Sequence, residues 1–284
     1  METSIDGRFV ALLAGGALML MSGVAQAGIA GTKHDLSSTS TGPNKYSGTA
    51  ELCVFCHTPH GSSTAAVVPL WNRTLTVASS YTTYAALGTT TMDGKTAAVG
   101  SVSIACLSCH DGLTAMNTMI NTPGSGTVPL SGTWTSTFGG VDTATGKIIG
   151  AATKIGTDLQ NDHPVGVQYG GGGYLASNYT TATGATVAKI GNDKDFYAPN
   201  AQNIGGTSAY FWVETGANNT KSKTDLVLYT RNDVVDYTGS GAITGDDQPY
   251  VECATCHDPH TANNPTFLRI SNAGSALCLS CHDK

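Results

Sequence analysis

The chain has 284 residues, with 14 lysines and arginines against 20 aspartates and glutamates, and only 12% of its residues are charged. This balance excludes a basic nucleic-acid binder and an acidic disordered tail. Large aliphatic side chains are sparse, whereas there are 35 glycines, eight cysteines and eight histidines. Such a chain needs something other than its own side chains around which to build a core.

The first 27 residues have the pattern of a secretory signal peptide. An apolar run over 9–21 follows Arg8 and precedes Ala25-Gln26-Ala27, so we predict cleavage before Gly28 and export. The run is shorter than the about 20 residues of a membrane-spanning helix. A buried N-terminal helix is the alternative. No later segment reaches spanning length, so no membrane span is expected.

All eight cysteines belong to four C-x-x-C-H motifs, at 53–57, 106–110, 253–257 and 278–282. This motif is the attachment signature of c-type haem. On a helical turn, positions i, i+3 and i+4 share one face, so both sulfurs and the imidazole reach the haem from one side. Disulfides or zinc sites would not explain a histidine after every pair. We predict four covalently bound haem c groups. The thioether cysteines would be Cys53, Cys56, Cys106, Cys109, Cys253, Cys256, Cys278 and Cys281, and the proximal iron ligands His57, His110, His257 and His282.

Four further histidines match the predicted number of haems: His34, His60, His163 and His260. Each haem iron has a second axial position, so we predict that these four are the distal ligands. For any one of them alone, an exposed or hydrogen-bonded histidine is the alternative interpretation.

An internal repeat suggests which histidine serves which haem. ELCVFCHTPH at 51–60 resembles VECATCHDPH at 251–260, and CLSCHD occurs twice. Pro59 and Pro259 restrict the local backbone, so we expect His60 and His260 to be aimed at an adjacent haem. The simplest assignment gives His60 to the Cys106/Cys109 haem and His260 to the Cys278/Cys281 haem. His34 and His163 remain for the first and third haems, in an order left open.

The remaining sequence predicts a single domain over 28–284. Its haem-binding segments are 34–112 and 251–284, and a Gly/Thr-rich insert over about 113–250 contributes His163. Strand-like content occurs at 127–140, 185–191, 209–215 and 226–229. Helix is expected at the motifs, for example over 103–111 and 275–283. The predicted fold is a mostly irregular multihaem cytochrome c fold, with short helices at the C-x-x-C-H turns, minor β strands and the haem stack as core.

The motifs together resemble a known family. The four C-x-x-C-H sites, the two C-H-x-P-H doublets, the CVFCHTPH…PLWNR stretch at 53–73 and Asp-His-Pro-Val-Gly at 162–166 are similar to exported multihaem cytochromes of metal-reducing bacteria. The tetrahaem nanowire cytochromes of the OmcE type are the closest in pattern, and the hexahaem OmcS type is more distant. The resemblance covers both ends of the mature chain well and the middle poorly. It implies bis-histidine ligation, haems in alternating parallel and T-shaped pairs, and polymerisation with one histidine crossing between subunits.

These features predict an electron carrier, not an enzyme. We expect like subunits to join head to tail in a conductive filament outside the cell, with redox partners or extracellular electron acceptors. His34 is preferred over His163 as the ligand supplied to the next subunit, because Pro164 pins the backbone beside His163, whereas His34 lies on a mobile-looking arm. A soluble periplasmic shuttle is the first alternative. A multihaem reductase is the second, but it requires an open iron position that the four spare histidines would close.

Overall fold

The computed structural model describes residues 28–124, 130–162, 164–174, 193–204, 208–216, 221–233 and 246–283. The predicted signal peptide, His163 and the strand-like segment 185–191 lie outside these residues. The helices are α2 (Ser103–His110), α3 (Cys253–Cys256) and α4 (Ala276–Leu279), with short 3-10 turns at Ala78–Ser80, Tyr84–Leu87, Tyr169–Gly171, Pro265–Phe267 and Ala273–Ser275. The strands are β1 (Asn44–Tyr46), β2 (Trp134–Ser136), β3 (Val167–Gln168), β4 (Asn200–Ile204), β5 (Ser208–Val213), β6 (Leu226–Asp233) and β7 (Asp246–Val251).

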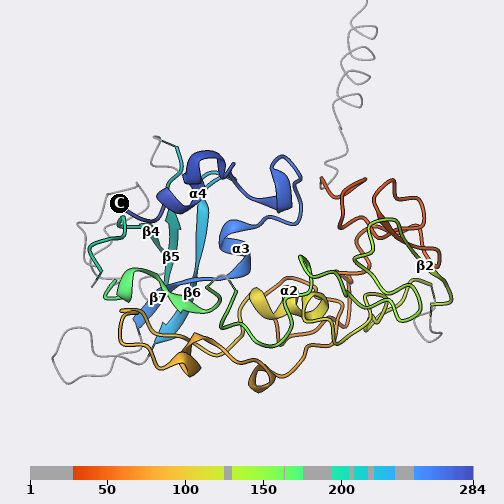
Figure 1. Ribbon diagram of the computed structural model, residues 1–284, viewed down its shortest axis with the longest axis horizontal. Helices are drawn as coiled ribbons and strands as arrows, with labels where there is room; N and C mark the ends of the chain where they lie inside the picture. The colour runs from red at the N-terminus through yellow and green to blue at the C-terminus, as the bar shows by residue number, and fades with distance from the viewer. Residues whose placement is uncertain are drawn as a thin grey trace, which may run out of the picture.

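The C-terminal lobe is built on an antiparallel five-stranded sheet with the order β3-β7-β6-β5-β4, seen on the left of Figure 1. The register places Phe211 opposite Leu228 and Val213 opposite Leu226, so these buried side chains share one face of the sheet. They form an apolar cluster with Tyr169, Tyr174 and Leu277, against which Cys256 and Cys281 pack. The sheet therefore supports the third and fourth C-x-x-C-H motifs.

Two further apolar clusters support the other motifs. Leu107 of α2 is fully buried and packs with Tyr81, Ile104 and Leu159, and this cluster touches Cys56 and Cys253. In the N-terminal lobe, β1 pairs with β2 beside a cluster that holds Phe55, Trp134 and Met116 and touches Cys56 and Cys109. Two of the motif cysteines thus pack against each apolar cluster.

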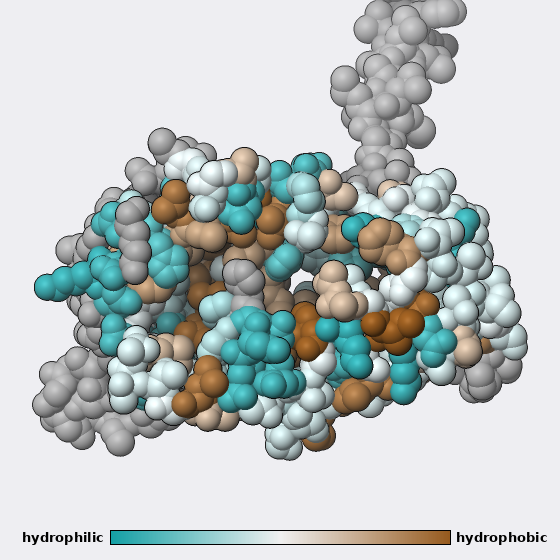
Figure 2. All heavy atoms as spheres, in the orientation of Figure 1, coloured by the Kyte–Doolittle hydropathy of each residue, from teal (hydrophilic) through white to brown (hydrophobic). Residues whose placement is uncertain are grey.

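The two lobes are separated by a hollow. Figure 2 shows an opening between the sheet lobe and the N-terminal lobe, with hydrophobic residues along part of its border. Helices α2 and α3 lie between the lobes in the ribbon view (Figure 1). Within the described ranges, no helix is both long enough and apolar enough to cross a bilayer.

The local predictions can be compared with these elements. Helix α2 lies within the predicted 103–111, and α4 lies within 275–283. Strand β2 falls inside 127–140, while β5 and β6 overlap 209–215 and 226–229. Within the insert, β3 to β6 join β7 in the five-stranded sheet, whereas β2 pairs with β1.

Candidate haem sites

Each C-x-x-C-H motif forms a helical turn, which we call the first to fourth attachment turns (53–57, 106–110, 253–257 and 278–282). In the first, third and fourth turns, the histidine N–H donates to the carbonyl of the first cysteine, at 2.8, 3.1 and 3.0 Å. The second turn lies within α2. The two sulfurs and the imidazole of each turn are therefore presented on one face. All eight cysteines are in the described part of the chain, and none of them forms a disulfide.

Three of the four proximal histidines are oriented in the same way. The Nδ1 atoms of His57, His110 and His257 lie 2.8, 2.7 and 2.7 Å from the backbone carbonyls of Pro69, Thr153 and Thr266, respectively. A carbonyl can only accept, so Nδ1 carries the proton and Nε2 presents its lone pair. This is the arrangement that metal-binding histidines use.

The internal repeat extends beyond the motifs into a returning segment. Thr58 donates its N–H to the Leu70 carbonyl, and Asp258 donates to the Phe267 carbonyl. Leu70 and Phe267 both have positive φ, at 57° and 61°. Two residues further along each segment, the N–H groups of Asn72 and Arg269 donate to the carbonyls of Cys56 and Cys256. The same loop therefore supplies the Nδ1 acceptors of the first and third turns, although the sequences 58–73 and 258–270 share little.

Two pairs of histidine rings stand at the separation expected of two axial ligands. The ring centres of His34 and His110 are 6.2 Å apart, as are those of His57 and His260. A nitrogen–metal bond is about 2 Å long and the ring centre lies about 1 Å further, so two axial rings have centres about 6 Å apart. The interplanar angles of 88° and 21° both suit such a pair, since rings can take any rotation about the axis joining them.

These ring pairs differ from the pairings expected from the repeat, which remain predictions. The second turn was expected to face His60, but its His110 faces His34. His260 was expected to serve the fourth turn, but its ring faces His57 of the first. The physical reason is that packing between the lobes, and not proximity along the chain, decides which ring a histidine meets.

His34 is half-buried and packs against other segments of the chain, which differs from the arm expected from the sequence. Asp35 is buried and accepts hydrogen bonds from the Gly31 N–H at 2.8 Å and the Ser37 hydroxyl at 2.7 Å. The His34 ring stacks on Phe267 with centres 4.3 Å apart. Burial, with the nearby His110, lowers the pKa of His34 to about 4, although a hydrogen bond to the Pro259 carbonyl opposes this. Its Nδ1 is buried without a hydrogen-bond partner in the described structure, so His34 is neutral and keeps a nitrogen free.

His60 is exposed, in contrast to His34. Its carbonyl accepts from the Asn121 side chain at 2.7 Å. It lines a surface cavity of about 680 Å³ together with Cys53 and His57. Among the described residues, His60, His257 and His282 have no second histidine ring at the 6.2 Å separation of the two pairs. His163 lies outside the described residues.

The fourth turn is held by the segment before β4. His282 contacts the Phe196 ring with centres 4.3 Å apart, and Tyr197 donates its N–H to the Cys281 carbonyl at 2.9 Å.

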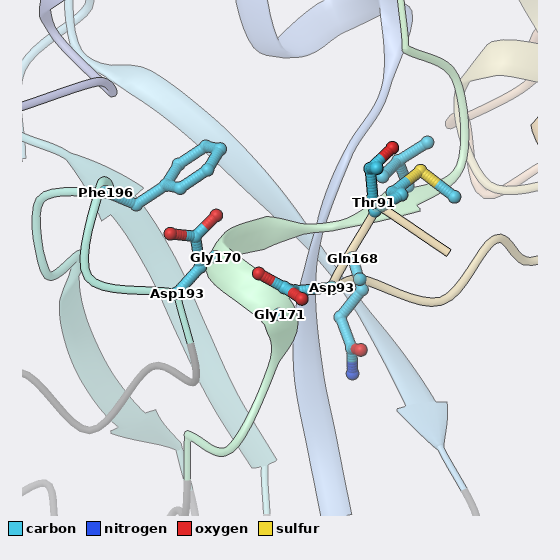
Figure 3. A pocket seen from close by; sticks show the side chains of 10 residues that line it. Thr91, Asp93, Gln168, Gly170, Gly171, Asp193 and Phe196 are labelled. Carbon is cyan, nitrogen blue, oxygen red and sulfur yellow. The ribbon is translucent and has the colours of Figure 1, made fainter. Parts of the chain in front are cut away.

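Phe196 also lines a smaller cavity of about 240 Å³ beside the Gly170–Gly171 turn, where Figure 3 shows the carboxylates of Asp93 and Asp193. Both glycines have positive φ, which residues with a Cβ rarely adopt.

The attachment turns follow one another in chain order. Burial raises the pKa of Cys56 to about 12, with a contribution from the neighbouring Cys109 thiol. A hydrogen bond with the Cys253 thiol, together with burial, raises the pKa of Cys106. Burial and the nearby Cys256 raise the pKa of Cys281 to about 12. The first turn is thus beside the second, the second beside the third, and the third beside the fourth.

Comparison with known families agrees with this geometry. Residues 247–284 match the family described as Doubled CXXCH motif. The match covers the third and fourth attachment turns and supports a multihaem c-type cytochrome with covalently bound haem c and a role in electron transfer. It does not single out the OmcE or OmcS type. No curated protein matches the chain.

The residues of the turns fit haem c. The thiols lie on helical turns, three proximal imidazoles have Nδ1 committed to a carbonyl, and two ring pairs have the spacing of axial ligands. Among the described residues, no three Cys, His, Asp or Glu side chains converge as a bare metal ion would require. The Nδ1 hydrogen bonds and the ring spacing are what favour haem over zinc. The Nδ1 acceptors were missed from the sequence because a backbone carbonyl has no sequence signature.

Proposed function

We propose that this chain is an exported tetrahaem electron carrier and not an enzyme. The observation that carries the proposal is the continuous row of four attachment turns that crosses from one lobe to the other. Cys56 and Cys109 pack against one apolar cluster, Ser103 of α2 binds the N–H of Cys253, and Cys256 and Cys281 pack against another cluster. Haem c, when bound, supplies reversible one-electron exchange at its iron. The protein holds successive groups in fixed order, so electrons can pass from one end of the row to the other.

We assign His260 as the distal ligand of the first haem and His34 as that of the second, on the ring separations of 6.2 Å. His60 and His163 are then left for the third and fourth haems. A neutral imidazole such as that of half-buried His34 is suited to iron because the metal binds the unprotonated nitrogen. With a histidine at each of the four distal positions every iron would be closed, which favours a carrier over a reductase.

The first test is the haem count and spin state of the intact protein. We expect four covalent haems per chain, all low-spin when oxidised and when reduced, with little binding of carbon monoxide. The measurements are the pyridine haemochrome, electron paramagnetic resonance and the visible spectrum. A high-spin signal equal to one haem in the fully assembled protein would contradict the closed sites and favour a reductase.

The second part of the proposal is a filament of like subunits. The first and fourth turns end the row, and Cys53 and Cys278 at these two turns are exposed. A head-to-tail contact between the two ends would continue the row and give an open filament when its rotation does not close a ring. We propose His60 as the ligand that crosses this contact, since it is exposed beside the first turn. His34 is unsuited to that role because its ring already faces His110.

Two alanine variants separate these roles. His60→Ala should give monomers in which one haem is high-spin, because the distal ligand of a neighbouring subunit is removed. His34→Ala should also make one haem high-spin but leave the filaments intact, because its ligand acts within the subunit. Electron microscopy and spectroscopy on the same samples check both. Filaments of His60→Ala with four low-spin haems would exclude the crossing, and wild type that stays monomeric at high concentration would favour the periplasmic shuttle.

A further inference from the structure

A single buried hydroxyl links the second and third attachment turns. Ser103 begins α2 and is fully buried. Its Oγ donates to Oε2 of Glu252 and accepts from the N–H of Cys253 at 3.0 Å. Cys253 is the first thiol of the third turn, so this hydroxyl contacts both the start of α2 and the start of α3.

Glu252 is the centre of the contact. It is buried, and it caps the N-terminus of α3 through reciprocal hydrogen bonds with Thr255. Its Oε1 accepts from Arg231 of β6 through Nε at 2.8 Å and also through an Nη group. Arg231 in turn donates to the Ala98 carbonyl at 2.7 Å. Glu252 therefore joins β6, α3 and the segment before α2.

The burial of the Glu252 carboxylate favours keeping its hydrogen bonds with Ser103 and Arg231 intact. Burial raises the pKa of Glu252, while Arg231 and Ser103 oppose that shift by binding the charged form. A buried carboxylate without partners is strongly unfavourable, so opening the contact would expose the protein to that penalty. The three side chains thus hold one another in place.

We propose that Ser103, Glu252 and Arg231 are positioning residues that set the distance and angle between the second and third haems. This inference rests on the proposed electron transfer for its consequence. The junction is the place where the row passes from one lobe to the other, and here Ser103 of α2 accepts from the N–H of Cys253, the first cysteine of the third turn, at 3.0 Å. A shift of α2 against α3 would therefore move one haem relative to the next and slow electron exchange across the middle of the row.

The other junctions have contacts of their own, which provides a matched control. Arg73 donates to the Oγ and the carbonyl of Ser108, on the part of α2 that lies beside Cys109. Ser108 is as buried as Ser103 and lies on the same helix. Ser108→Ala thus removes a comparable hydroxyl without touching Glu252.

The experiment is nuclear magnetic resonance of the reduced, fully loaded protein, in which Overhauser contacts between adjacent haems are assigned. Ser103→Ala should lose or weaken the contacts between the second and third haems and keep those of the first with the second and of the third with the fourth. Ser108→Ala should keep the contacts between the second and third haems. The potential of the third haem should shift in Ser103→Ala and not in Ser108→Ala, whose hydroxyl lies within the second attachment turn.

Glu252→Gln, which keeps the volume and one oxygen acceptor, gives a second measurement if Ser103→Ala does not accumulate, and it should weaken the same contacts. Unchanged contacts between the second and third haems in a loaded variant of either kind, with only thermal stability lowered, would overturn the inference. Failure of the proposed function is recognised separately, because wild type would then lack four low-spin haems.

Discussion

Replacing His260 with alanine is expected to turn the haem at Cys53 and Cys56 high-spin and to leave the haem at Cys278 and Cys281 low-spin. The reason is the position of the His260 ring, whose centre lies 6.2 Å from that of His57. The backbone turn should survive, because the N–H of residue 260 donates to Oδ1 of Asp258 at 3.0 Å and does not need the imidazole. One of the four low-spin haems should be lost, as measured by electron paramagnetic resonance.

The identity of the affected haem has a direct control. Adding Cys53→Ser and Cys56→Ser to His260→Ala removes the attachment of the first haem, so the high-spin signal should disappear with it. Persistence of that signal in the combined variant would show that His260 serves another haem. His60→Ala, the counterpart in the internal repeat, should leave the first haem low-spin.

The attachment turns are the part of the site that sequence reasoning describes best. The C-x-x-C-H spacing is a local helical pattern, and the expected helix over 103–111 corresponds to α2. The ring that each candidate distal histidine meets is not local in sequence. His260 meets His57, and His34 meets His110, only because distant segments fold onto one another. The repeat directed attention to neighbouring motifs and so suggested different partners.

In the sheet, too, strands with a strand-like local composition were predicted, whereas a strand that depends on pairing with distant segments was not. Residues 209–215 and 226–229 have strand-like composition and lie in β5 and β6. Strand β7 was not predicted, because Asp246, Asp247 and Pro249 are unfavourable in strands. On one side of β7, Pro249 is paired with Thr230 of β6. On the other side, β3 pairs only with Tyr250 and Val251, which follow the proline. Pro249 thus lies beyond the end of β3, where β7 has no neighbour on that side among the described residues, so its missing N–H is tolerated.

Replacing Arg73 with methionine is expected to lower the free energy of unfolding by about 4 kcal/mol, because buried hydrogen bonds from a charged group are lost together. Arg73 is fully buried. Besides its two bonds to Ser108, it donates to the carbonyls of Met116 at 2.7 Å and Ala115 at 2.9 Å. Methionine fills much of the space but leaves these carbonyls unpaired. Denaturant unfolding of the loaded protein measures the loss, which is a large share of the 5–15 kcal/mol typical of a domain.

Arg269→Met is the matched control. Arg269 follows the third attachment turn much as Arg73 follows the first, but its side chain is 12% exposed and donates to two carbonyls, those of Ala254 and Lys223. Its replacement should lower the free energy of unfolding by about half as much or less. Equal losses in the two variants would contradict the special position of Arg73.

Arg73 should also act on the electron carriers themselves. Its described hydrogen-bond partners are all neutral, and its charge opposes the rise in the pKa of both Cys56 and Cys109. The guanidinium therefore favours negative charge at the first and second turns, which in the loaded protein means the reduced, less positive iron. Arg73→Met should lower the reduction potentials of these two haems and leave those of the third and fourth nearly unchanged. Potentiometric titration of the four haems checks this prediction. A general loss of packing would shift all four reduction potentials or none of them.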